Sequence, residues 1–189
     1  MTTADLVNRA RALANAGHYD EVVRLCEPLA QDGNLDCRSL LGWIYLKGNQ
    51  SVPKDIARAI VWLEPVAKLK HATSAYLLGT AHFESSSYAD ACHWFEVSGE
   101  NGYSAGWYQL AKMYRAGMGV SIDISRAKML FSKAAQLGHI YAQREVALDN
   151  YRHAKGLARK VRAGFLFVRA IFMGIGAAVS EPYSEKTFH

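Results

Sequence analysis

Several features that would assign a function are missing from this sequence. Its three cysteines, Cys26, Cys37 and Cys92, are an odd number with no paired spacing, so the sequence does not indicate a disulfide framework. The first residues, MTTADLVNR, lack the apolar core of a secretory signal peptide. Both absences predict a protein of the reducing cytoplasm.

No catalytic or metal-binding pattern stands out either. No C-x-x-C or H-x-x-x-H pair would place two metal ligands on one helix face, although His82, Cys92 and His93 lie close in sequence. No spacing is typical of a Ser-His-Asp triad, a Cys-His pair or paired carboxylates. The sequence predicts no catalytic residue, metal, cofactor or small-molecule substrate; an enzyme that uses His82 or His93 remains an alternative hypothesis.

A pair of glycines, Gly117 and Gly119, is placed where a phosphate-binding loop could lie, beside the start of a predicted helix. Such a loop follows a strand and has a pattern such as G-x-x-x-x-G-K-[ST]. Here the pair follows a predicted helix, and no Lys-Ser or Lys-Thr comes next. The pair therefore predicts a turn between two helices and no nucleotide site.

The charge distribution does not favour nucleic acid as a partner. The net charge is +5, but residues 1–152 hold 16 Lys and Arg against 15 Asp and Glu, and residues 153–189 hold 6 against 2. Affinity for a duplex comes from neutralising many phosphates, which needs basic residues spread along the domain. The excess is instead crowded into residues 155–169.

What the sequence does contain is an internal repeat. Residues 41–48, LGWIYLKG, recur as LAKMYRAG at 110–117, and LGTAHF at 78–83 is a copy between them. The period is about 32 to 37 residues, as in helix-turn-helix repeats. Because half of the 189 residues are hydrophobic, the chain can bury a core and is not a disordered one.

Apolar residues inside each unit are spaced at i, i+3, i+4 and i+7, which predicts helices. We expect ten of them, near residues 3–16, 19–31, 35–47, 55–70, 72–84, 88–101, 103–116, 123–137, 139–151 and 155–179. A single antiparallel pair cannot bury both of its faces, so neighbouring pairs must stack. The sequence predicts an all-α solenoid of about five helix-turn-helix repeats with an additional basic and apolar C-terminal helix.

Small and capping residues fit this arrangement. Gly42, Gly79 and Ala111 fall where the two helices of one pair would approach most closely. Asp55 and Asp123 come just before second helices, where a carboxylate accepts backbone N–H bonds as an N-cap.

These motifs resemble the Sel-one-like repeat family, a branch of the tetratricopeptide-like α/α solenoids. The matching features are the Leu-Gly-x-x-Tyr helix, the Gly-x-Gly-Val-x-x-Asp loop and the Ala-x-x-x-Phe/Trp helix. The resemblance covers residues 3–150, and it departs at residues 48–53, where the second loop glycine is missing. It implies a fold, and by analogy a bacterial protein that assists signalling or cell-envelope assembly, such as surface polysaccharide systems; it is nearly silent on function itself.

By analogy with tetratricopeptide repeats, the first helix of each unit lines a concave partner-binding groove. Tyr, Trp and Arg are frequent at interface hot spots. The expected groove residues are Ser39, Trp43, Tyr76, Thr80, Tyr108, Lys112, Arg115 and Arg144. The alternative is that these aromatic rings pack between helices.

The C-terminal segment differs from the repeats. Residues 163–179 are 17 residues with one charge, at the short limit for a membrane span, and basic residues precede them. Three interpretations are open: an interfacial or inserted membrane helix, a helix docking on a membrane-protein partner, and a closing helix over the last repeat. The residues expected to form this anchor are Lys155, Arg159, Lys160, Arg162, Phe165, Phe167, Arg169, Phe172 and Gly174.

Together these observations predict a repeat domain over residues 1–152, a basic and apolar helix over 153–179 and a flexible tail over 180–189. The expected function is a non-enzymatic adaptor for a protein client, cytoplasmic and peripheral to, or anchored at, the inner membrane. The alternative is a soluble regulatory module that binds one client, with the last helix as a structural cap.

Overall fold

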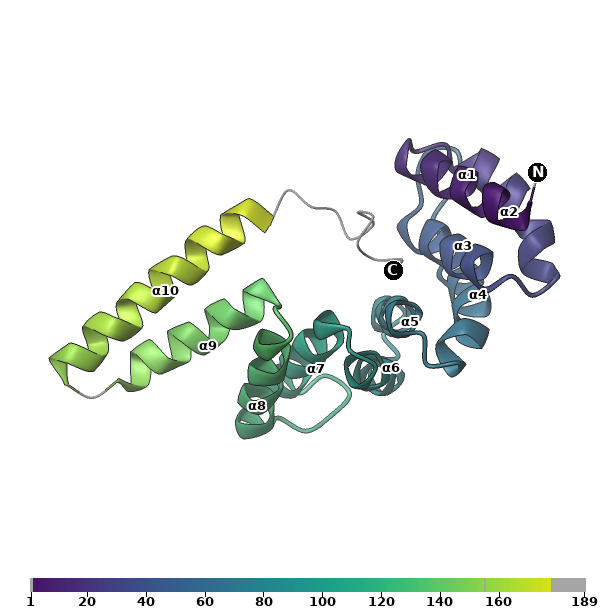
Figure 1. Ribbon diagram of the computed structural model, residues 1–189. Helices are drawn as coiled ribbons and strands as arrows, with labels where there is room; N and C mark the ends of the chain where they lie inside the picture. Colours follow the sequence, from purple (N-terminus) through teal and green to yellow (C-terminus); the bar gives the residue numbers. More distant parts are fainter. Residues whose placement is uncertain (1, 155, 178–189) are drawn as a thin grey trace.

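A computed structural model describes residues 2–154 and 156–177, and within these residues the protein consists of ten α-helices joined by turns (Figure 1). The helices are α1 (Thr3–Asn15), α2 (Tyr19–Gln31), α3 (Leu35–Lys47), α4 (Ile56–Lys68), α5 (Ala72–Glu84), α6 (Tyr88–Glu100), α7 (Ser104–Ala116), α8 (Ile124–Gln136), α9 (Ile140–His153) and α10 (Leu157–Ala177). The all-α fold and its five helix pairs are therefore confirmed.

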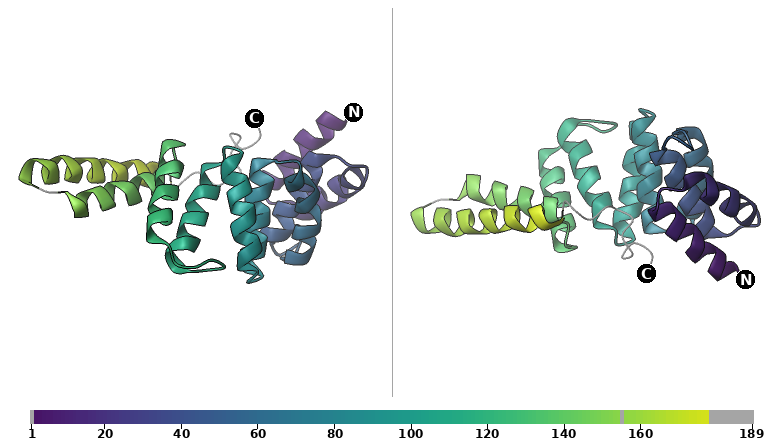
Figure 2. Two further views of the ribbon diagram at one scale, coloured as in Figure 1. Left: turned by 90° about the horizontal axis from the view of Figure 1, so that it is seen from below. Right: turned by 90° about the horizontal axis from the view of Figure 1, so that it is seen from above.

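Each helix packs against the next one along the chain, and the pairs follow one another in an arc (Figure 1). In this view α5 and α7 lie nearer the hollow of the arc than α6 and α8. Figure 2 shows the same pairs from below and above, with α9 and α10 side by side at one end. The arrangement is that of an α/α solenoid, in which contacts are mostly between neighbours.

The glycine pair at the end of α7 is a turn, as the sequence predicts. Gly117 caps α7 with φ 69° and Gly119 has φ 71°, values in the left-handed region that glycine tolerates. The turn closes when the Asp123 backbone N–H donates to the Tyr114 carbonyl at 3.0 Å. The Asp123 carboxylate then accepts from Arg126 N at 2.8 Å and caps α8.

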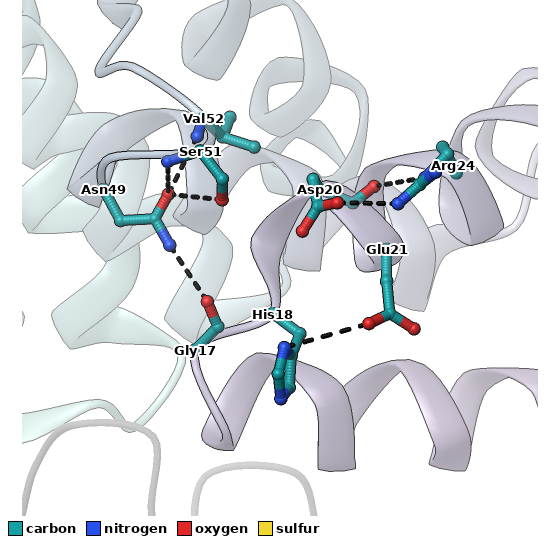
Figure 3. A network of polar contacts seen from close by, with 8 residues as sticks. All are labelled: Gly17, His18, Asp20, Glu21, Arg24, Asn49, Ser51 and Val52. Carbon is teal, nitrogen blue, oxygen red and sulfur yellow. Dashed lines mark hydrogen bonds and ion pairs between the residues drawn. The ribbon is translucent and has the colours of Figure 1, made fainter.

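The equivalent turn between α3 and α4 lacks the second glycine, and Asn49 holds it together instead (Figure 3). Asn49 Oδ1 accepts from the backbone N–H groups of Ser51 at 2.9 Å and Val52 at 2.8 Å. Its Nδ2 donates to the Gly17 carbonyl at 3.0 Å, in the turn between α1 and α2. A single side chain thus folds its own loop and ties it to the preceding pair.

Close helix contacts within the pairs depend on glycine, as expected. A Cβ added at Gly42 would lie 2.3 Å from Leu63 Cγ, and one at Gly79 would lie 2.7 Å from Phe95 Cδ1. The apolar core around these contacts runs from α1 to α5, and a second buried cluster continues from α6 to α9. Stacking therefore supplies the core that no single pair could form.

The last helix, α10, lies against α9 along one face. The Phe167 ring stacks on Tyr151 with centroids 6.4 Å apart, and Ala170 is buried. This contact agrees with the interpretation of α10 as a closing helix, but that interpretation leaves the opposite, apolar face of α10 unexplained. The expected tail at residues 180–189 lies outside the described residues.

Candidate partner-binding surface

Two residues that the sequence assigns to the groove lie in the core instead. Ser39 is 3% exposed and Trp43 is 6% exposed. The Ser39 hydroxyl is 2.8 Å from that of Ser74, and the Trp43 ring packs edge-on against Tyr19 at 5.4 Å. The reason is that α3 contacts α1, α2, α4 and α5, which leaves these side chains no face toward a partner.

Tyr76 and Thr80 on α5 are half-buried. Thr80 Oγ1 donates to the Tyr76 carbonyl at 3.0 Å, and the Tyr76 ring meets the Tyr103 ring edge-on at 5.2 Å. Gln109 Nε2 donates to the Tyr76 hydroxyl at 3.5 Å. Tyr76 therefore joins α5 to α7, and only part of its ring is available to a partner.

The start of α9 and the middle of α7 form a cluster of rings, which we call the α7–α9 ring cluster: Tyr108, His139 and Tyr141. Tyr108 stacks on His139 with centroids 4.3 Å apart and lies 6.3 Å from Tyr141. Tyr141 is 46% exposed. The Lys112 ammonium lies 5.7 Å from the centre of the Tyr108 ring and donates to Gln109 Oε1 at 3.1 Å, so a cation borders the rings.

Two rings of this cluster, His139 and Tyr108, have pKa values shifted so that the neutral form is favoured. Burial lowers the pKa of His139 to about 4, because the apolar surroundings disfavour the imidazolium. Its Nδ1 accepts from the Ala142 backbone N–H at 3.2 Å and caps α9. Burial, with the nearby Glu145 carboxylate, raises the pKa of the Tyr108 hydroxyl. The Lys112 ammonium thus lies beside the neutral Tyr108 ring.

The two arginines of the expected groove differ in their surroundings. Arg115 pairs with Glu145 at 3.0 Å and lies 5.0 Å from the Phe131 ring centre, beside a hollow of about 230 Å³ between α7, α8 and α9. Its charge is already matched within the chain. Arg144 on α9 is exposed.

Sequence reasoning missed His139 and Tyr141, although the repeat contains a signal for the first of them. His71 and His139 are 68 residues apart, the offset of the repeat itself, and each caps the helix that follows it. Aligning the units on this histidine would have placed His139 at the start of a first helix, next to Tyr108 of the preceding one.

Elsewhere in the described part of the chain, no group of three or more His, Cys, Asp or Glu side chains is arranged to hold a metal ion. His82 is half-buried, with Nδ1 4.0 Å from Asp90 Oδ2, and the His93 ring packs on its neighbour Trp94. In the contacts that the structure shows, neither imidazole ring is hydrogen-bonded to a serine or cysteine side chain; the Ser85 hydroxyl donates to the His82 backbone carbonyl.

The predicted anchor residues lie mostly on the exposed side of α10. Arg159, Lys160, Arg162 and Arg169 are exposed, and Phe165 and Phe172 are each 70% exposed, whereas Phe167 packs on α9. Lys155 lies outside the described residues, and at Gly174 the structure describes only the helical backbone. Among the helices that the structure describes, none combines the length and apolarity needed to cross a bilayer.

The fold defines a class, the α/α helical-repeat proteins. Residues 36–71 and 108–139, the pairs α3–α4 and α7–α8, match the Sel1 repeat family model. These two regions of the chain are therefore Sel1 repeats, as their motifs predict. Sel1-repeat proteins bind protein partners and serve as interaction scaffolds.

Solved structures of other repeat proteins share this fold. A Sel1 repeat protein from Oxalobacter formigenes superposes with a TM-score of 0.71 and 22% identity, over 92% of this chain and 70% of that one. The protective antigen c5321, present in uropathogenic Escherichia coli strains, superposes with a TM-score of 0.68 and 24% identity, over 82% of this chain and 34% of that one. In sequence, the Arabidopsis thaliana ERAD-associated E3 ubiquitin-protein ligase component HRD3B is 27% identical over 120 residues, 64% of this chain but 20% of that protein. The chain thus matches one fifth of this relative's length.

Proposed function

We propose that this protein is a non-enzymatic adaptor that holds a protein client on the surface formed by α5, α7 and α9. The observation that carries the proposal is the α7–α9 ring cluster, in which a half-exposed Tyr141 and a stacked Tyr108 lie beside the Lys112 ammonium. Aromatic rings bury a large area at little conformational cost, and a neighbouring cation adds attraction to an acidic group.

This surface does not include Ser39 and Trp43. It extends along α5 with Tyr76 and Thr80, and along α7 and α9 with Arg115 and Arg144. The half-buried Tyr76 and Thr80 would contact the client through the exposed parts of their side chains, and the exposed Arg144 would provide a positive charge at the rim of the surface. A client segment lying across α5, α7 and α9 would contact side chains from three successive units, as expected for a solenoid.

The setting of this adaptor comes from the family resemblance and from α10. We propose a bacterial protein at the cytoplasmic side of the inner membrane, where it assists a cell-envelope or signalling complex, with α10 fixing its location through a membrane surface or a membrane protein. The exposed basic and apolar side chains of α10 support this role.

The client surface can be tested by capture from cell extract after crosslinking, with quantitative mass spectrometry. We expect Tyr141→Ser with Lys112→Gln to lose a defined set of proteins that the wild type captures. Met129→Ser is the matched control, since Met129 is 54% exposed on α8, outside the cluster. Equal capture by all three proteins would show that the ring cluster holds no client.

A further inference from the structure

The outward face of α10 carries an apolar stripe that no other described part of the chain covers. Val161, Phe165, Val168 and Phe172 are 66%, 70%, 47% and 70% exposed. They are spaced by four, three and four residues along the helix. We call this stripe the α10 seam.

The seam has the width of a contact between two helices. At about 100° per residue, its four side chains fall within an arc of about 60° on the helix. Leu166 is also exposed, at 46%, but it lies about 100° round the helix from Phe165 and lines a hollow against α8 and α9. A helix that lies in a lipid interface or on a broad core presents an apolar face of about 100° or more, whereas a narrow stripe with 4-3-4 spacing is the pattern by which one helix receives another.

The charged residues beside the α10 seam indicate what charge a partner helix would carry. Arg162 and Arg169 directly follow seam residues and are seven positions apart, so both lie on the same flank. α10 contains no Asp or Glu, and neither arginine forms an ion pair with the described residues. A second copy of α10 in antiparallel orientation would bring arginine against arginine, and in parallel orientation it would leave both arginines without a charged partner. A helix with acidic flanks would pair with both.

We propose that the α10 seam binds a partner's amphipathic helix of about three turns, with apolar residues at 4-3-4 spacing and acidic residues beside them. The stretch from Val161 to Phe172 is about 17 Å long at 1.5 Å per residue, which sets the length of this contact. The proposal builds on the adaptor role by adding a second partner, at a surface separate from the α7–α9 ring cluster.

The test uses the full chain and two labelled helical peptides of about 20 residues. Both peptides carry leucine at 4-3-4 spacing; one has Glu at the flanking positions and the other has Lys. Fluorescence anisotropy should give at least about tenfold tighter binding of the Glu peptide. Phe165→Ser with Phe172→Ser should weaken this binding on the order of 30-fold, as expected for buried aromatic anchors.

Charge reversal separates a specific contact from general stickiness. Arg162→Glu with Arg169→Glu should reverse the preference, so that the Lys peptide binds more tightly. Lys160→Glu is the control, because it makes the same change on α10 away from the seam and should leave the preference unchanged. Circular dichroism would check that each variant keeps its helix content.

Three results would overturn the proposal: no preference between the peptides, binding only to phosphatidylglycerol vesicles, or self-association through α10 in sedimentation. The first and third would leave the client surface intact if Tyr141→Ser with Lys112→Gln still lost its captured proteins. Conversely, unchanged capture by Tyr141→Ser with Lys112→Gln would refute the ring-cluster proposal and leave the α10 seam proposal standing.

Discussion

The contact between α6 and α7 allows a sharp test of the packing, through Gly106. A Cβ at this position would lie 2.6 Å from both Gly99 N and the Phe95 carbonyl oxygen. Both are backbone atoms of α6 and cannot rotate away as a side chain could, so Gly106→Ala has to push two helices apart. We expect the variant to be destabilised.

The size of the effect follows from two opposing contributions. Overpacking a close contact costs about 1–3 kcal/mol, and the fixed backbone favours the upper end. Replacing Gly by Ala in a helix returns up to about 1 kcal/mol. The net loss should be about 2 kcal/mol, which for a chain of this size corresponds to a fall of about 4–8 °C in Tm.

Gly164→Ala on α10 is the matched control. Its added Cβ would be 3.6 Å from Tyr151 Cε2, an ordinary contact, so only the propensity gain of up to about 1 kcal/mol remains. Thermal and urea unfolding followed by circular dichroism would compare the two variants. If Gly106→Ala were within about 0.5 kcal/mol of the wild type, the close approach of α6 and α7 would be refuted.

Three further predictions concern caps, protonation and thiols. Asp123→Ala should cost about 1 kcal/mol in urea unfolding through loss of the bond to Arg126 N, and Asp123→Asn should restore most of it; equal stability of Ala and Asn variants would contradict the cap. The pKa of His139 is lowered from 6.5 to about 4 in the folded chain, so the unfolded chain binds the proton first and stability should fall as pH drops from about 6.5 toward 4. His139→Asn, which keeps a capping side chain, should remove this part of the acid sensitivity. A pH profile of stability that is the same in the variant and the wild type would contradict the lowered pKa of His139. Cys92 is buried and burial raises the pKa of its thiol, so a colourimetric thiol reagent should react with it only after unfolding; rapid reaction in the native protein would refute the burial.

Much of the fold could be predicted because helix pairs leave a local record in the sequence. The 3.6-residue spacing locates each helix, and Gly117 and Asp123 mark the end of one and the start of the next. The turn at Asn49 could not be read in this way, since its bond to the Gly17 carbonyl joins residues 32 positions apart.

The binding surface was harder to predict because exposure depends on neighbours that are distant in sequence. Trp43 has the side chain of an interface hot spot, but α3 is enclosed by four other helices and the ring is buried. On α10, Phe165 and Phe167 are two residues apart in one apolar run, and only the position of α9 decides that Phe167 packs inward while Phe165 faces out.

The uneven depth of burial along the solenoid has a consequence for its dynamics. Nine residues of α3 are buried, while α9 buries only Ala142 and the described side chains of α10 only Ala170. In a one-dimensional array the pair with the least buried surface opens at the lowest free energy. Amide hydrogens of α9 and α10 should therefore exchange first. A helix bound along α10 would slow that exchange, first in the last pair and then in the pairs next to it. Hydrogen exchange at this end of the solenoid would therefore report whether the α10 seam is occupied.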